Sequence, residues 1–372
     1  MRTIRTELCA LLGIEHPVLL AGMGSLTGEG NAAGPRLVAA VSEAGGMGVL
    51  GGAGLAPGDL RAQIREIKGL TRKPFGVDVL FPEGLGASLP VGIPWAELRR
   101  RHVPEEHAEF VAAMSRRHGI PAGAAEVGFV LDEANAREQV RVMLEEGVTL
   151  CCAGLGFPEW LVPMAREGGM KVLGLTGSVR MAARIRKAGA DLIVAQGHEA
   201  GGHTGKIGTF ALVPQVVDAV APVPVIAAGG IGDGRGLAAA LALGAVGAWV
   251  GTAFLFATEA DVPMAHRQMM RDACEEDTVI SPAWTGKTLR QLRSPIQMAF
   301  DRSGLSPLPM PLHLALMIDL LQGLAHEKRH DLMCAPAGQI VGMLEETRSA
   351  GEILESMVAQ AATILGEKLG AP

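Results

Sequence analysis

The sequence predicts an α/β protein built as a (β/α)8 TIM barrel, with a helical lid domain after the eighth strand and an insertion after the third. Short apolar runs alternate with amphipathic helical patterns, which is typical of a parallel sheet with right-handed crossovers. About eight such units follow one another, which favours a closed barrel over an open sheet. The 50 glycines supply the turns between the units.

The expected strands are buried-looking runs of about four to eight residues bounded by turn residues. They are 16–22, 46–52, 74–81, 148–154, 171–175, 191–196, 223–230 and 246–251. The expected helices carry apolar residues three and four positions apart. They are 34–45, 58–68, 132–147, 178–188, 213–220 and 233–243.

Two segments interrupt this repeat and set the expected domain boundaries. Residues 82–125 form a polar, helical insertion in the third unit, and residues 258–335 are helical, Met-rich and charged. Both follow the carboxyl ends of strands, where a barrel keeps its active site. We therefore expect a barrel domain at 1–257, a lid segment at 258–335, and C-terminal helices at 336–372 that return to the barrel.

Composition and charge narrow the class of protein. Charged residues make up 19% of the chain and the net charge is −6, so no basic surface attracts nucleic acid or anionic membranes. No uninterrupted apolar run approaches the roughly 18 residues of a membrane helix. The five cysteines contain no CxxC pair, and the first residues lack a signal-type cleavage site. We expect a cytoplasmic protein with a small-molecule substrate.

The stretch QGHEAGGHTG, residues 196–205, is close to the H-E-x-x-H signature of zinc proteases. That signature places two histidines four residues apart on one helix face, whereas His198 and His203 are five apart. Gly201 and Gly202 each disfavour a helix by about 1 kcal/mol. No metal is expected here. Chemistry alone leaves two interpretations of His203 open: a general base toward a carbon acid beside a flat cofactor, or hydrogen bonds within its own loop.

Glycines follow the seventh and eighth expected strands. Gly229 and Gly230 end one strand, and Gly251 and Thr252 end the next. Loops at these positions of a barrel often bind a phosphate through backbone amides. Tight βα turns without a ligand are the alternative. Asp233 is expected only as the N-cap of the helix that follows.

A glycine pattern elsewhere imitates a dinucleotide fingerprint. Gly46, Gly48 and Gly51 match G-x-G-x-x-G, but they lie before and within an expected strand instead of between a strand and a helix. A Rossmann domain is therefore not supported.

Together these motifs resemble the nitronate monooxygenase family, formerly called 2-nitropropane dioxygenase. The resemblance rests on AGMG after strand one, FGVDVLF at strand three, AQGHEAGGHTG after strand six, AAGGIGDGRG and GTAFL after strands seven and eight, and the later TGK and AGQ. It extends from residue 10 to about 345, apart from the insertion. The FMN-dependent enoyl-ACP reductases share many of these motifs.

The resemblance implies FMN held without a covalent bond at the carboxyl ends of the strands. His203 matches the family's catalytic histidine, with Gly201 and Gly202 beside the flavin. Gly22, Met23 and Gly24 match the loop under the isoalloxazine, Gln196 matches a residue near the ring or ribityl chain, and Gly229, Gly230, Gly251 and Thr252 match the phosphate cradle. Asp78 stands where the family usually has Asn, so an ionised carboxylate would oppose the anionic reduced flavin unless its pKa is raised.

The reaction that the resemblance implies is oxidation of alkyl nitronates or nitroalkanes with O2 to a carbonyl compound and nitrite. Two alternatives are an NAD(P)H-dependent FMN reductase of enoyl thioesters or quinones, and a barrel that binds a phosphorylated ligand without redox chemistry. The expected partners are a small-molecule substrate and O2, with a homodimer left open, and neither nucleic acid nor a membrane. Substitution of His198 is expected to be tolerated, because it occupies a variable position of the motif.

Overall fold

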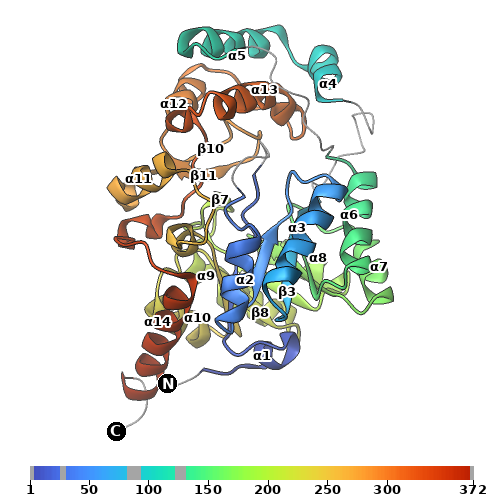
Figure 1. Ribbon diagram of the computed structural model, residues 1–372, viewed down its shortest axis with the longest axis vertical. Coiled ribbons are helices and arrows are strands. Elements are labelled where there is room, and N and C mark those ends of the chain that lie inside the picture. Colours follow the sequence, from blue (N-terminus) through green and yellow to red (C-terminus); the bar gives the residue numbers. More distant parts are fainter. Residues whose placement is uncertain (1–3, 26–30, 82–93, 122–130, 369–372) are drawn as a thin grey trace.

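The computed structural model describes residues 4–25, 31–81, 94–121 and 131–368 (Figure 1). Eight parallel strands lie in the order β1-β9-β8-β6-β5-β4-β3-β2. The two ends of this order also meet, because Leu19 bridges Met47, and the Leu20 amide donates to the Met47 carbonyl at 2.9 Å. The closed sheet confirms the predicted TIM barrel. Its strands are β1 Val18–Leu20, β2 Gly48–Gly51, β3 Phe75–Leu80, β4 Leu150–Gly154, β5 Lys171–Thr176, β6 Leu192–Gln196, β8 Val225–Ala228 and β9 Gly247–Val250.

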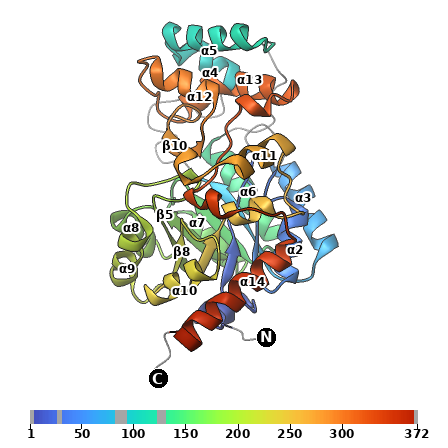
Figure 2. The ribbon, with the colours of Figure 1, turned by 90° about the vertical axis from the view of Figure 1, so that its left-hand side faces the viewer.

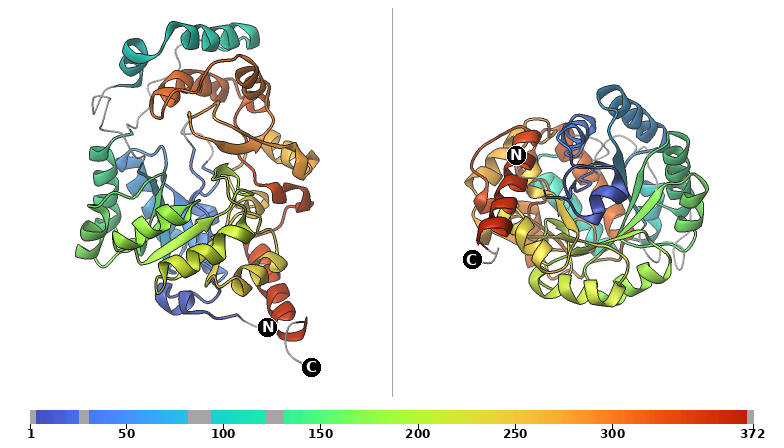
Figure 3. Two further views of the ribbon diagram at one scale, coloured as in Figure 1. Left: turned by 180° about the vertical axis from the view of Figure 1, so that it is seen from behind. Right: turned by 90° about the horizontal axis from the view of Figure 1, so that it is seen from below.

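Helices surround the barrel, as the view from below shows (Figure 3). They are α2 Pro35–Glu43, α3 Pro57–Leu70, α6 Glu133–Glu145, α7 Leu161–Glu167, α8 Val179–Lys187, α9 Thr209–Val220 and α10 Gly234–Ala242. Helix α9 begins four residues earlier than its apolar pattern predicts. The cause is a distant cap: the Glu199 carboxylate accepts hydrogen bonds from the Thr209 amide and hydroxyl at 3.0 and 2.8 Å. Asp233 caps α10 as expected, accepting from the Arg235 amide at 2.9 Å.

The barrel strands separate two hydrophobic layers. Side chains that point inward form one cluster with the short helix α1 (Glu7–Leu12), which covers the lower end of the barrel (Figure 3). Side chains that point outward pack against the helices in a second, larger cluster. Successive side chains of a strand point to opposite faces of the sheet, which produces the two layers. The inward-pointing side chains fill the barrel below the carboxyl ends of the strands. Inward-pointing members include Leu19, Val49, Cys152, Leu173 and Trp249.

The lid segment lies beyond the carboxyl ends of the strands and contains more than helices (Figure 2). Its helices are α11 Met264–Asp272, α12 Pro295–Arg302 and α13 Leu312–His326, and between α11 and α12 it adds the strands β10 Thr278–Ser281 and β11 Leu289–Leu292. The segment therefore contains the expected helices together with two strands that the sequence pattern did not predict. These two strands form a three-stranded antiparallel sheet with β7 (Gly202–His203). Because β7 pairs with β11, which is remote in sequence, no local sequence pattern indicates this sheet.

The insertion joins the lid segment. Only its residues 94–121 are described, and they form α4 (Trp95–His102) and α5 (Glu105–His118). Both helices contact α13, and Trp95, Leu98 and Met114 share one hydrophobic cluster with apolar side chains of α12 and α13. Arg99 also pairs with Asp319 of α13. The two interruptions of the barrel repeat thus share a core although most of the barrel separates them in sequence.

The C-terminal segment returns along the outside of the barrel (Figure 1). Helix α14 (Ala350–Thr363) packs on α10 and α2, and it approaches α10 so closely that a Cβ on Gly234 would lie 2.4 Å from the Met357 carbonyl oxygen. Across the described residues, helices long and apolar enough for a bilayer are lacking.

Candidate functional site

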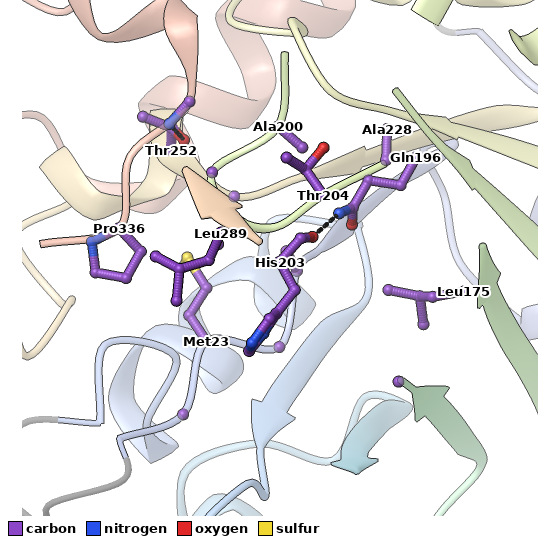
Figure 4. A pocket seen from close by; sticks show the side chains of 18 of the residues that line it. Met23, Leu175, Gln196, Ala200, His203, Thr204, Ala228, Thr252, Leu289 and Pro336 are labelled. Carbon is purple, nitrogen blue, oxygen red and sulfur yellow. Dashed lines mark hydrogen bonds between the residues drawn. The ribbon is translucent and has the colours of Figure 1, made fainter. Parts of the chain in front are cut away.

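One cavity of about 1260 Å³ lies between the carboxyl ends of the barrel strands and the lid segment. Its wall contains every residue that the sequence singled out for the site, and Figure 4 shows several of them around it. They are Gly22, Met23, Gly24, Asp78, Gln196, Gly201, Gly202, His203, Gly229, Gly230, Gly251 and Thr252. The structure therefore brings the ends of five separate strands, or the loops after them, to one place, as the convergence of strand ends in a barrel requires.

The loop after β6 is held in shape by its own polar groups. The Gln196 side-chain amide donates to the His203 carbonyl at 2.6 Å, as drawn in Figure 4. The His198 imidazole Nδ1 is 2.8 Å from the Gly205 carbonyl oxygen, and the His198 amide donates to Ile207. His198 therefore faces its own loop, whereas the ring of His203 is directed into the cavity. The two histidines have different partners and do not form a pair.

The lid segment pairs directly with this loop. Strand β11 runs antiparallel to β7, with Leu289 opposite His203 and Arg290 opposite Gly202. The Arg290 guanidinium, only 4% exposed, donates to the His198 carbonyl at 3.1 Å and to the Thr278 hydroxyl at 2.8 Å. A charge-assisted bond of this kind is among the stronger hydrogen bonds in proteins. The lid segment therefore fixes the backbone of the loop that contains His203.

The imidazole of His203 has one partner, and that partner also comes from the lid. Its Nε2 is 2.8 Å from the hydroxyl oxygen of Thr285. We assign the tautomer protonated on Nε2, in which the Thr285 oxygen accepts from the ring while its hydroxyl donates to the Lys287 carbonyl at 3.3 Å. The described residues give Nδ1 of His203 no hydrogen-bond partner. The neutral ring therefore keeps its free lone pair on Nδ1.

Burial, and secondly the positive charge of Lys287, lower the pKa of His203 from its usual 6.5 to about 4. Removing a cation from water is costly, and a second cation nearby adds to that cost. His203 is consequently an unprotonated base at neutral pH. A base of this kind on the wall of a mostly apolar cavity can accept a proton from a carbon acid.

Asp78 lies on β3 beneath the loop after β1. A Cβ on Gly22 would be 2.2 Å from the Asp78 Cβ, so the chain passes directly over this carboxyl group. The Asp78 Oδ1 is buried and has no hydrogen-bond partner among the described residues. Burial raises the pKa of this carboxyl well above its usual 3.8. The group is thus a neutral carboxylic acid over an extended pH range, and it can donate a hydrogen bond into the cavity.

The turns after β8 and β9 form the opposite wall. Gly229 and Gly230 have φ angles of +94° and +74°, in the left-handed region that favours glycine. The Thr252 hydroxyl accepts a hydrogen bond from the Gly338 amide at 2.9 Å, and a Cβ on Gly338 would be 2.8 Å from the Glu199 carbonyl oxygen. The AGQ segment, residues 337–339, therefore packs against the turn after β9 and against the β6 loop.

Four residues of this site were not assigned a role from the sequence. Thr285, Lys287 and Arg290 belong to the lid and act on the β6 loop, and Glu199 caps α9. The TGK motif, residues 285–287, is one of the motifs that resemble the family, but the sequence does not indicate which residues it contacts. Only the pairing of β11 with β7 brings this motif to His203.

Known proteins share much of the sequence and the fold of this chain. A protein of Mycobacterium tuberculosis with a provisional monooxygenase name is 38% identical over 99% of both chains. The nitroalkane oxidase of Streptomyces ansochromogenes superimposes with a TM-score of 0.79 at 29% identity, covering 95% of this chain and 97% of that one. FabK from Thermotoga maritima gives a TM-score of 0.76 at 32% identity over 99% of both chains.

The family model described as nitronate monooxygenase matches residues 5–360, nearly the whole chain. That match, the barrel and the relatives identify the protein as a flavin-dependent oxidoreductase. The chain belongs to the nitronate monooxygenase family.

Proposed function

We propose that this protein is an FMN-dependent oxidase that converts alkyl nitronates and nitroalkanes, with O2, to a carbonyl compound and nitrite. The observation that carries the proposal is His203, an unprotonated base held by Thr285 on the wall of the cavity. The similarity to the nitroalkane oxidase of Streptomyces ansochromogenes supports the same reaction class.

The cavity has the features that FMN requires. Gly22, Met23 and Gly24 leave a wall with little side-chain bulk, and the unpartnered Asp78 Oδ1 offers a polar group to the flavin ring. The glycine turns after β8 and β9 would allow the backbone amides of Gly230, Gly251 and Thr252 to approach a phosphate. Gln196, whose side chain already donates to the His203 carbonyl, would contact the ring or ribityl chain. FMN bound there would accept electrons from the substrate and pass them to O2.

The residues of this chain would perform the proton transfer. His203 Nδ1 takes the α-proton of a neutral nitroalkane, and the C–H electron pair moves onto the two nitro oxygens. Thr285 meanwhile keeps the proton on Nε2, which fixes the tautomer and the orientation of the ring. A nitronate that arrives already ionised does not need this step. The mostly apolar wall limits water near the reacting carbon.

A second candidate is an NAD(P)H-dependent FMN reductase of enoyl thioesters or quinones. The observation that favours it is the extent of the cavity, which continues under the lid to His266, Leu321 and His330 and is larger than the roughly 300–1,000 Å³ of typical ligand pockets. The similarity to FabK from Thermotoga maritima points the same way.

Anaerobic mixing of the purified protein distinguishes the two. The yellow protein should release FMN on heating, and a colourless protein would exclude both candidates. Propyl or ethyl nitronate should then bleach the bound flavin without added nucleotide. Bleaching by NADH or NADPH alone, with none by the nitronates, would reject the oxidase and support the reductase.

A further inference from the structure

One part of the cavity is lined by the lid segment and not by the ends of the barrel strands. We call it the lid arm and define it by six residues of the cavity wall, His266, Met270, Leu321, Ala325, His330 and Met333. His266 and Met270 are about one turn apart on α11, and Leu321 and Ala325 are about one turn apart on α13, so each pair shares one helix face. The third side is η3 (His330–Leu332), which contacts both helices. Three elements of the lid therefore enclose the arm.

The lid arm is separate from the residues proposed to hold FMN. Those residues lie on or directly after the barrel strands β1, β3, β6, β8 and β9, whereas the arm belongs to α11, α13 and the segment that follows α13. The arm and His203 nevertheless line one continuous cavity. The arm can therefore receive a part of the substrate that contacts neither the flavin nor the base.

Four of the six side chains of the lid arm are apolar. Met270, Leu321, Ala325 and Met333 are each at most 9% exposed, and they come from all three elements or the residue directly after them. An unbranched chain gains about fourfold in affinity for each methylene group that such a wall removes from water. Most of the arm therefore suits an alkyl chain.

The two imidazoles form the polar end of the lid arm. His266 Nε2 is 2.9 Å from the His330 carbonyl oxygen, so we assign the His266 proton to Nε2 and the lone pair to Nδ1. The two rings are in edge-to-face contact, with centroids 5.6 Å apart. Among the described residues, the buried His330 Nδ1 has no hydrogen-bond partner. An unpaired buried nitrogen costs free energy, which a ligand that hydrogen-bonds to this ring would recover.

This polar end suits a neutral group. Burial lowers the pKa of His266, and the hydrogen bond to the His330 carbonyl offsets only part of that effect. Asp261, the acidic residue of the cavity wall nearest to His266 in sequence, is exposed and is not among the causes of this shift. A hydroxyl group can donate to an imidazole lone pair or accept from an imidazole N–H, so it fits either neutral tautomer of His330.

We propose that the lid arm binds the tail of the substrate, an unbranched apolar chain that ends in a hydroxyl group hydrogen-bonded to His330. The proposal deepens the proposed function and rests on it for the nitro or nitronate group at the other end of the chain, beside His203. It names the substrate class as a chain-like nitro compound with a terminal hydroxyl group, longer than nitroethane or nitropropane.

Primary alcohols test the lid arm without any reaction. Dissociation constants of the series from 1-butanol to 1-octanol are measured by calorimetry on the purified protein. We expect affinity to rise about fourfold for each added methylene group in wild type. In Ala325→Phe the new ring fills the arm, and the gain should fall below about twofold for each methylene group. The matched control is Ala265→Phe, which adds the same ring at an exposed position of α11 and should leave the series unchanged.

The same gain per methylene group in wild type and Ala325→Phe would overturn the proposal, as would a wild-type series without a gain. Leu321→Ala is the second variant should Ala325→Phe not fold. It enlarges the arm, so it should change the dissociation constant of 1-octanol more than that of 1-butanol. Equal changes for the two alcohols would place the chain outside the arm.

The polar end has its own test in the same series. His330→Phe keeps a flat ring and the backbone carbonyl that His266 contacts, but it removes the ring nitrogens. Every alcohol should bind about three- to tenfold more weakly, while the gain per methylene group stays as in wild type. His330→Gln keeps a hydrogen-bonding side chain and should recover part of the loss. Unchanged affinities in His330→Phe, or equal losses in both variants, would overturn the assignment of the hydroxyl group to His330.

These outcomes are separable from those of the proposed function, because alcohol binding requires no turnover. If the alcohols bind as expected but nitronates fail to bleach the flavin, the lid arm stands and the oxidase reaction falls. If nitronates bleach the flavin but the alcohols bind wild type and Ala325→Phe alike, the oxidase reaction stands and the lid arm falls.

Discussion

The imidazole Nε2 of His203 lies 2.8 Å from the hydroxyl oxygen of Thr285, and the two residues come from different parts of the molecule. His203 belongs to the loop after barrel strand β6, and Thr285 belongs to the lid. The antiparallel pairing of β7 with β11 holds them in register. The orientation of the His203 ring therefore depends on the contact between the lid segment and the barrel.

Thr285→Ala should impair the reaction without affecting the cofactor. The hydroxyl is buried, and its loss removes the acceptor that orients the ring, worth about 0.5–1.5 kcal/mol. We expect kcat/KM for a neutral nitroalkane to fall by up to about tenfold, while the flavin content stays the same. Thr285→Ser keeps the hydroxyl and should retain most activity. Equal losses in both variants would mean that the methyl group, and not the hydrogen bond, matters.

His203→Ala should distinguish the two forms of substrate. Loss of a general base costs about 10²–10⁴-fold. We expect a loss of that size in steady-state kcat/KM for neutral nitroalkanes and a clearly smaller one for nitronates, which need no proton removal. His198→Ala, in the same loop but turned toward Gly205, is the control and should change both rates little. Small, equal losses for both substrates in His203→Ala would remove the general-base role.

The pH dependence should reflect the lowered pKa of His203. A base must be unprotonated, so activity is lost as pH falls through its pKa in the folded protein, about 4 instead of 6.5. The profile of kcat/KM for a neutral nitroalkane should therefore stay level on its acidic side down to about pH 5, provided the protein remains folded. A fall centred near 6.5 would show that the ring is not desolvated as the structure indicates.

Asp78→Asn should stabilise the protein increasingly as pH rises. The folded protein holds the Asp78 proton above pH 3.8, where the unfolded chain releases it. Wild type therefore loses stability as pH rises from 3.8 toward the raised pKa, by about 1.4 kcal/mol for each unit of the shift. Asn carries no such titration. Unfolding free energies of both proteins, measured by urea titration from pH 4 to 9, should diverge with pH, and parallel curves would contradict the assignment.

Gly230→Val should reduce the flavin content. Gly230 has a φ of +74°, where a β-branched side chain is strained by about 1–3 kcal/mol, and it lines the proposed phosphate site. Gly169→Val is the matched control, with a φ of +71° and open space around its Cβ position away from the cavity. Both variants should lower Tm, but only Gly230→Val should lower the flavin-to-protein ratio. An unchanged ratio would reject the phosphate placement.

Much of the site could be predicted from the sequence because its residues belong to local motifs. Gly22, Gln196, His203, Gly230 and their neighbours each end or follow a barrel strand. The carboxyl ends of the strands in a barrel always meet at one face, so these residues are expected to lie together. Alternation of apolar runs with helical patterns determined the barrel in the same way. Strands, helices and turns that depend on the spacing of residues within one contiguous segment could be predicted correctly.

The tertiary structure decided which distant groups act on those residues. The strands β10 and β11 were missed because each is only four residues long, and only β11 pairs with the remote β7, at two positions. The pKa values of His203 and Asp78 depend on burial and on Lys287, which no sequence spacing records. The sequence by itself determined the barrel and the positions of its loops. Packing of the lid onto the barrel decided the charge and orientation of the base, since desolvation and Coulomb forces depend on distance in space.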